Sequence, residues 1–325
     1  MVEQRDCNGS ARAACSRPWS AGMKALVSFC LLLAAAGAIA GTPVLTPRQT
    51  IGGGRIEASI IDMPPSIQRR PEFAGYVTWT SITAVGSRGT FLYVFDSGRQ
   101  QIFRYDLVRQ TMTAFAPSPG ARVTALAVGP DLSVYAADSG ARKVLHFARD
   151  GRLLRTFSNP RELAQPVALA FDETSGNLWV ADALFKHVAV FNSLGLLTDL
   201  ITPSDARSIA AMARGPQGLY LVDRIDRKIV VIGRDEQEHP GFGTDSLQDP
   251  AAIAVDQYGR VFVADNFYRS IRIYKEGQLI GSVGPEGPAP VMFGRIGGLW
   301  LEGNTLYAAD SLNGRVQSFA VAPPE

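Results

Sequence analysis

The sequence predicts an all-β protein, specifically a six-bladed β-propeller of four-stranded antiparallel blades, closed by an N-terminal strand that completes the last blade. Two observations predict this fold. One sequence unit recurs six times along the chain, and within each copy apolar residues alternate with polar ones over short runs bounded by turn residues. Alternation with period two excludes helical repeats, and a repeat of about 40 to 45 residues with four strand candidates has the size of a propeller blade.

The six copies align on an aspartate that ends the second strand of each. These aspartates, separated by 42, 44, 41, 42 and 45 residues, are Asp96, Asp138, Asp182, Asp223, Asp265 and Asp310. An aromatic residue stands three positions before each, namely Tyr93, Tyr135, Trp179, Tyr220, Phe262 and Tyr307. A β-branched residue stands six positions after each, namely Ile102, Val144, Val188, Ile229, Ile271 and Val316. We expect these positions to form the core between blades, because a small sheet buries both faces only by stacking on its neighbours.

The strands of a blade are clearest in the second copy, where we expect them at residues 123–128, 133–138, 143–147 and 153–157. The first copy has four strands of its own, and its last strand ends near residue 115. The sixth copy has only three, at residues 298–302, 305–310 and 315–321. We therefore expect the lone strand candidate Ile56–Ile61 to supply the missing outer strand, which joins the two termini and removes an exposed sheet edge.

Residues 1–40 are predicted to be an N-terminal extension and signal peptide. Lys24 precedes an apolar run over residues 25–36, and Ala38-Ile39-Ala40 matches an A-x-A cleavage site. Met23 is a candidate for the true start. The run is shorter than the roughly 20 residues that span a bilayer, so we expect cleavage and an exported protein, periplasmic or secreted, with no membrane attachment. Residues 41–75 follow as a linker with the closing strand, and residues 76–325 form the propeller.

Charge and cysteine usage exclude several classes of function. The chain has 32 basic and 30 acidic residues, and residues 1–40 hold four of the former and two of the latter, which leaves 28 of each. A neutral mature protein does not indicate nucleic-acid binding. All three cysteines, Cys7, Cys15 and Cys30, precede the predicted cut, so neither disulfides nor thiolate metal sites are expected. We expect a monomer without a cofactor.

The fifth copy, which runs from Pro250-Ala251-Ala252-Ile253-Ala254-Val255-Asp256 to Val261-Phe262-Val263-Ala264-Asp265 and continues to Arg269 and Ile271, resembles the NHL repeat. The six copies cover roughly residues 76–325. The resemblance implies a six-bladed propeller that binds ligands on the face carrying the loops between second and third strands. Such propellers include protein-binding modules, RNA-binding modules, and lyases or lactonases with a metal in the pore, so it does not imply one activity.

The ring of six aspartates has two interpretations: acidic groups repeated around an axis could bind a cation, or the carboxylates have a structural role. We favour a structural one, in which each carboxylate accepts backbone N–H bonds of the following turn and pairs with a nearby base. Those bases are Arg99, Arg142, Lys186, Arg227, Arg269 and Arg315. If some of the bases are unpaired, the same face is instead a site for an anionic partner.

The ligand-binding candidates lie where the innermost strands begin, at the pore mouth on that face. The first residues of these strands are Thr80, Arg122, Gln165, Arg207, Asp249 and Arg295. Arginine recurs in alternate blades, where a forked donor could converge on a carboxylate or phosphate, or the recurrence is chance. Phe267 and Tyr268, with Phe185, form a second candidate, an exposed aromatic patch for a protein or glycan, unless they pack between loops. The predicted ligand-binding residues are Arg122, Gln165, Arg207, Asp249, Arg295, Phe267 and Tyr268.

No catalytic set emerges from the sequence. A zinc site needs converging histidines, but His146 and His187 belong in or beside third strands and His239 is expected in a loop before Pro240. No G-x-S-x-G motif is present. A calcium site at the predicted mouth has only Asp249, because Asp172, Asp256 and Glu302 belong at the other ends of their strands. The first hypothesis is therefore a non-catalytic binding or scaffold module for a protein or an anionic ligand; the alternative is a metal-dependent lactonase- or lyase-like enzyme with its site in the pore.

Overall fold

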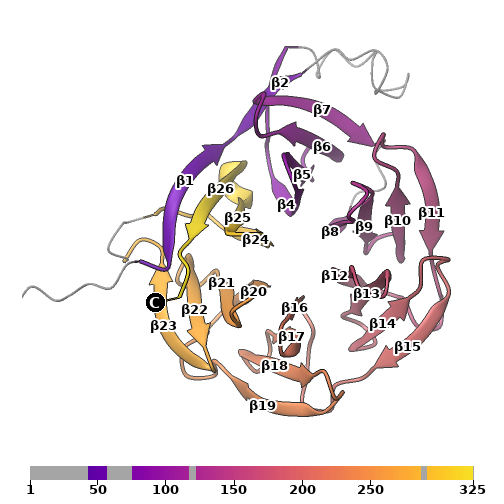
Figure 1. Cartoon of the computed structure of the whole chain (residues 1–325), viewed down its shortest axis with the longest axis vertical. Coiled ribbons are helices and arrows are strands. Elements are labelled where there is room, and N and C mark those ends of the chain that lie inside the picture. Colours follow the sequence, from indigo (N-terminus) through magenta and orange to yellow (C-terminus); the bar gives the residue numbers. More distant parts are fainter. Residues whose placement is uncertain (1–42, 57–74, 117–121, 287–290, 325) are drawn as a thin grey trace, which may run out of the picture. The chain divides into compact units, whose positions relative to one another are not determined.

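The computed structural model describes residues 43–56, 75–116, 122–286 and 291–324, and the part of the chain from Pro43 onward forms one compact unit. Six β-sheets are arranged in a ring around a central axis (Figure 1). The predicted six-bladed β-propeller is therefore confirmed. The predicted signal peptide, the alternative start at Met23 and all three cysteines lie outside the described residues. Within those residues no helix is long and apolar enough to cross a membrane.

The first three blades follow the chain from the axis outward. Blade 1 contains β4 (Ile82–Arg88), β5 (Phe91–Asp96), β6 (Gln101–Asp106) and β7 (Thr111–Ala116). Blade 2 contains β8 (Val123–Val128), β9 (Val134–Asp138), β10 (Lys143–Phe147) and β11 (Leu153–Phe157), which confirms the strands expected in the second copy. Blade 3 contains β12 (Pro166–Asp172), β13 (Asn177–Asp182), β14 (His187–Phe191) and β15 (Leu197–Ile201).

The last three blades repeat the order. Blade 4 contains β16 (Ala211–Gly215), β17 (Gly218–Asp223), β18 (Lys228–Gly233) and β19 (Glu238–Phe242). Blade 5 contains β20 (Pro250–Val255), β21 (Arg260–Asp265), β22 (Ser270–Lys275) and β23 (Gln278–Val283). Blade 6 contains β24 (Ile296–Glu302), β25 (Thr305–Asp310), the short 3-10 helix η2 (Ser311–Asn313) and β26 (Arg315–Val321).

The repeated apolar positions form the core between blades, as predicted. All six β-branched residues after the aspartates are completely buried, and five of the six aromatic residues before them are buried. The exception is Trp179, which is half-buried. The guanidinium carbon of Arg214, in the next blade, lies 4.7 Å from the centroid of the Trp179 ring. Each fully buried side chain of this size contributes about 1.5 to 3 kcal/mol, so stacking of the blades is the main stabilising interaction of the ring.

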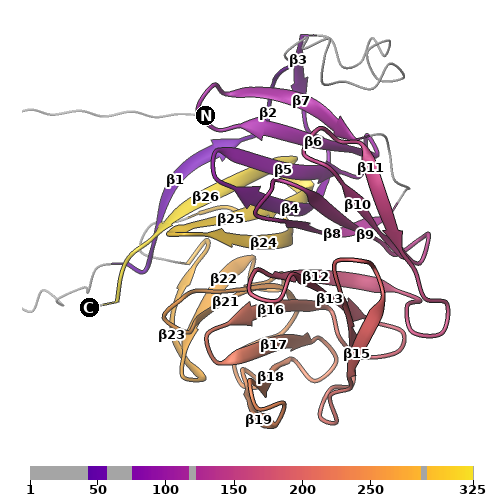
Figure 2. The same cartoon turned by 45° about the vertical axis from the view of Figure 1, so that its right-hand side comes forward.

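The ring closes through β1 (Leu45–Ile51), which pairs antiparallel with β26 from Leu45 opposite Val321 to Ile51 opposite Val316. An N-terminal strand thus completes blade 6, as predicted, and lies beside it in both views (Figures 1 and 2). The predicted identity of that strand was wrong. Pro47 argues against a strand in this segment, but it lies at a bulge on the outermost strand, where a residue without an N–H is tolerated.

The strand expected at residues 56–61 has a different place. Ile56 ends β2 (Gly53–Ile56), which pairs antiparallel with β3 (Tyr76–Thr78) and parallel with β7 of blade 1, and residues 57–61 lie outside the described residues. The glycines at the start of β2 carry the chain from the edge of blade 6 to the edge of blade 1. Gly53 has φ +146°, and a Cβ atom there would lie 2.1 Å from the carbonyl oxygen of Val77. The triple glycine therefore serves a close backbone crossing between the first and last blades.

Candidate functional site

The six aspartates are structural acceptors at the turns between the second and third strands. All six are buried, and Asp96 shows the pattern: its carboxylate accepts hydrogen bonds from the backbone N–H groups of Thr80 (2.9 Å), Ser81 (3.1 Å) and Gly98 (3.0 Å), and from the Thr80 hydroxyl (2.6 Å). Each carboxylate thereby holds its turn and, in five blades, the segment leading into the inner strand of the same blade. The predicted backbone-accepting role is confirmed. Every one of these carboxylate oxygens accepts a hydrogen bond except Oδ2 of Asp138, which is buried without a partner among the described residues.

The predicted pairing of each aspartate with a base holds in two blades. Arg99 lies 3.6 Å from Asp96 and Arg315 lies 3.0 Å from Asp310. In the other four blades no such ion pair is present among the described residues, so the prediction was wrong there. The four bases concerned, Arg142, Lys186, Arg227 and Arg269, all stand four positions after the aspartate, at the left-handed residue of the turn with φ between 52° and 57°. Arg99 and Arg315 stand three and five positions after it, which places them beside that residue.

The structure places the predicted mouth residues immediately before the inner strands. Arg122, Gln165, Asp249 and Arg295 directly precede β8, β12, β20 and β24, and Arg207 stands four residues before β16. The side chains differ in their partners. Asp249 is held by Arg224 at 2.6 Å, whereas Arg122 and Arg295 are exposed and make no ion pair within the described part of the chain. The three arginines are therefore not equivalent.

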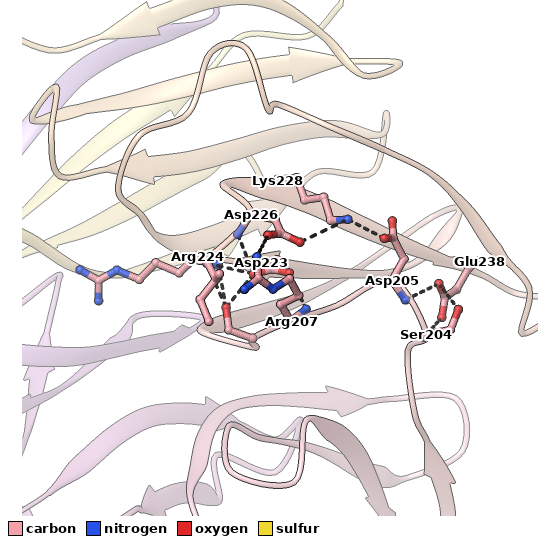
Figure 3. A network of polar contacts seen from close by, with 10 residues as sticks. Ser204, Asp205, Arg207, Asp223, Arg224, Asp226, Lys228 and Glu238 are labelled. Carbon is pink, nitrogen blue, oxygen red and sulfur yellow. Dashed lines mark hydrogen bonds and ion pairs between the residues drawn. The ribbon is translucent and has the colours of Figure 1, made fainter.

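Arg207 belongs to a polar network on blade 4 (Figure 3). Its guanidinium lies 3.0 Å from Asp226, and its backbone N–H donates to Asp223 at 2.7 Å. Lys228 bridges Asp205 (2.7 Å) and Asp226 (3.9 Å). Because a carboxylate already neutralises it, Arg207 has less charge available for an anion than Arg122 and Arg295 have.

The pKa of Asp223 predicts how this network responds to pH. Burial disfavours the charged carboxylate, but hydrogen bonds from the Ser208 hydroxyl and from the backbone N–H groups of Arg207, Asp226 and Ile225 outweigh burial and hold the pKa below its ordinary value of 3.8. A lowered folded-state pKa gives stability that is present above 3.8 and is lost as the pH falls through the folded-state pKa.

We therefore expect Asp223→Asn to lower the thermal midpoint at pH 7, and the difference from the unsubstituted protein to shrink as the pH falls below the ordinary aspartate value. Thermal midpoints measured at several pH values for both proteins check this. The control is Asp245→Asn, at an exposed site in the loop before β20. A gap that keeps its size down to acid pH would contradict the pKa shift as its cause.

The predicted aromatic patch is divided. Phe267 is 69% exposed and packs edge-on against Tyr268, with ring centroids 5.0 Å apart. Tyr268 is half-buried, and the guanidinium of Arg272 lies 3.9 Å from its ring centroid. Phe185 stacks on His187. Phe267 thus projects as a single apolar contact residue, supported by an aromatic ring and a cation.

A cavity of about 370 Å³ occupies the channel between the six inner strands. Its walls come mostly from alanine, glycine and valine, and none of the predicted mouth residues lines it. Four charged residues do, and all stand at or just after the carboxyl ends of inner strands: Arg88, Glu173, Arg214 and Glu302. Sequence reasoning placed Glu302 at this opposite end but overlooked both arginines. The repeat alignment was the available signal, since it puts them at the ends of β4 and β16.

The metal sites that the enzyme hypothesis requires do not fit the described residues. His146 stacks on Tyr135, His187 approaches the Glu162 carbonyl at 2.7 Å, and His239 lies in β19, an outer strand, rather than in the expected loop. The acidic candidates Asp172, Asp249 and Asp256 are held by Arg214, Arg224 and Arg260 respectively. Among the described residues no three His, Cys, Asp or Glu side chains gather in a metal-binding group.

Comparisons with known proteins agree with the fold. No protein-family model and no curated protein sequence matches the chain. Among solved structures, virginiamycin B lyase from Staphylococcus aureus is similar, with a TM-score of 0.59, 12% identity, and coverage of 75% of this chain and 96% of that one. A protein of unknown function from Bacteroides thetaiotaomicron has a TM-score of 0.62 and 15% identity, with coverage of 75% and 70%. At this identity the likeness concerns the fold alone: the chain is a six-bladed β-propeller similar in architecture to streptogramin B lyases.

Proposed function

We propose that this protein is an exported propeller of the NHL type that acts as a non-catalytic binding or scaffold module for a protein or an anionic ligand. Its ligand face carries the loops between second and third strands together with the residues that precede the inner strands. One observation carries the proposal: Arg122 and Arg295 are exposed at this face and make no ion pair within the described residues, whereas the aspartates of the same blades, Asp138 and Asp310, are buried and Asp310 pairs with Arg315 instead.

The other predicted residues take graded roles in this proposal. Gln165 lies between Arg122 and Arg295 in the sequence, and its exposed side-chain amide offers both a hydrogen-bond donor and an acceptor. Phe267 supplies an exposed apolar anchor for a protein or glycan, with Tyr268 beneath it. Arg207 and Asp249 orient the loops through their ion pairs with Asp226 and Arg224. The apolar segment at residues 25–36 and the neutral charge of residues 41–325 support export and argue against nucleic-acid binding.

Calorimetric titration with citrate and with inorganic phosphate tests the anionic arm. We expect Arg122→Ala and Arg295→Ala each to weaken citrate binding about tenfold, because a hydrogen bond to a charged group contributes about 1.5 to 3 kcal/mol. The control is Arg234→Ala, which removes an exposed arginine from the hairpin between β18 and β19. Equal affinities in all four proteins would reject an anion site at this face.

The alternative, a lactonase- or lyase-like enzyme with its site in the pore, draws support from the lyases among the structures of similar fold. Metal analysis of the purified protein separates the two proposals. Stoichiometric calcium or zinc, lost on chelation together with hydrolytic or lyase activity, would favour the enzyme. Binding of citrate that chelation leaves unchanged would favour the binding module.

A further inference from the structure

The channel cavity is a second polar environment, remote from the proposed ligand face. Each inner strand is the last strand of its sheet, so one backbone edge of β4, β8, β12, β16, β20 and β24 has no partner strand. The cavity lies among these six strands, which also lie nearest the axis in Figure 1. Its size, about 370 Å³, falls within the range of small-molecule sites in proteins.

Charge at the rim of this cavity is unbalanced. Two carboxylates, Glu173 and Glu302, and two guanidiniums, Arg88 and Arg214, line the cavity. Asp172 does not line it but adds a third carboxylate through its pair with Arg214, which leaves one negative charge in the group. Arg88 reaches from blade 1 past blade 2 to pair with Glu173 of blade 3, and Arg214 of blade 4 pairs with Asp172 at 2.8 Å. Both cations are therefore already committed to carboxylates.

Glu302 holds the remaining charge. It is half-buried at the end of β24, where its carboxylate accepts a single long hydrogen bond from the backbone N–H of Gly89 (3.3 Å). Within the described residues it makes no ion pair. A partly desolvated carboxylate with free acceptor capacity attracts a cationic donor more strongly than one in open water does.

The remaining lining favours a cation with an apolar body. Trp300 from β24 and Phe171 from β12 belong to the lining of the same cavity as Glu302, and one face of the Phe171 ring stacks on Tyr135. Aromatic faces attract ammonium groups, and alanine, valine and leucine side chains accept aliphatic or aromatic carbon. An anion would meet no free guanidinium here and would be repelled by Glu302.

We propose that the channel cavity binds an organic monocation, an amine with a compact apolar body, whose ammonium group pairs with the Glu302 carboxylate. The Arg88 guanidinium pairs with Glu173 and also interacts electrostatically with Glu302, which opposes the binding of a second cation there. This site goes beyond the proposed function, because it lies at the other end of the inner strands and takes a ligand of opposite charge.

Calorimetric titration with three probes of one shape but different charge tests the proposal: benzylamine, benzyl alcohol and benzoate. We expect benzylamine alone to bind with measurable affinity, and Glu302→Gln, which keeps the shape and the acceptor for Gly89, to weaken it about tenfold. Glu276→Gln, at an exposed hairpin residue outside the cavity lining, is the matched control and should bind as the unsubstituted protein does.

A second variant keeps the test independent of Glu302. Arg88→Met removes the guanidinium but retains the stem, so Glu173 loses its partner and benzylamine affinity should rise several-fold. Thermal midpoints of all variants confirm folding. The proposal is overturned if benzyl alcohol or benzoate binds as well as benzylamine, if no probe binds, or if Glu302→Gln and Glu276→Gln behave alike. None of these results bears on citrate binding at the opposite face.

Discussion

Replacement of Ile51 by aspartate is expected to lower the thermal midpoint by about 10 °C. Ile51 ends the closing strand β1, is buried, and packs in the core cluster shared by blades 1 and 6. Its burial contributes about 1.5 to 3 kcal/mol, and a charge in its place adds a desolvation cost of similar size. In a domain of this length each kcal/mol shifts the midpoint by about 2 to 4 °C. Differential scanning calorimetry of the purified protein measures the change.

The control for this prediction lies one residue away. Thr50 is exposed in the same strand, and Thr50→Asp should leave the midpoint within about 2 °C of the unsubstituted protein, as surface substitutions usually do. Deletion of residues 43–51 removes the whole strand, exposes the edge of β26 and should destabilise at least as much as Ile51→Asp. A deletion that leaves the midpoint unchanged would refute closure through β1.

Asp96→Ala is expected to have the second large effect, a loss of about 3 to 5 kcal/mol. The substitution leaves the backbone N–H groups of Thr80, Ser81, Gly98 and Arg99 and one hydroxyl without their acceptor, in a site where the carboxylate is fully buried. Each buried donor without a partner costs about 1 to 3 kcal/mol, reduced where water can reach it. Urea denaturation at pH 7 measures the free energy of unfolding.

Asp106 is the matched control in the same blade. It ends β6 and accepts hydrogen bonds from Val108 and Arg109 at 2.9 Å each, but its side chain remains partly exposed. Asp106→Ala should cost about 1 kcal/mol, because water can replace the lost acceptor. If Asp96→Ala and Asp106→Ala have the same free energy of unfolding, burial of the Asp96 carboxylate has no effect on stability. The structural role assigned to the six aspartates would then be wrong.

The positions of the strands could be predicted because they repeat. Aligning six copies on one aspartate places an aromatic residue, a β-branched residue and two turns in each, and these positions proved to be the core and the hairpins. The closing strand could not be predicted in this way, since it occurs once. Its Pro47 resembles a strand breaker when only local propensity is considered, and the edge position that makes it acceptable exists only after the ring closes.

The partners of charged side chains were harder to predict than the strands. Arg142 and Arg99 follow their aspartates at nearly the same distance, yet only Arg99 forms the ion pair, because one position of difference decides which residue takes the left-handed turn. Arg122, Arg207 and Arg295 recur at equivalent sites, but Arg207 is neutralised by Asp226. The pairing of Arg88 with Glu173 joins blades separated by another blade, and no spacing along the chain indicates it.

By itself the sequence determined the architecture of this protein. Hydrophobic periodicity and turn residues are local properties of the sequence, and they can be recognised because the same pattern occurs in six copies. It also determined that the aspartate of each copy is a turn acceptor, since that role depends on neighbouring backbone groups. Only the tertiary structure decided three features: which strand closes the ring, which arginines make no ion pair with other described residues, and that a cavity lined in part by Glu302 lies in the channel. Those features depend on contacts between residues that are far apart in the chain. The spatial distances between such residues are set only when the blades pack against one another.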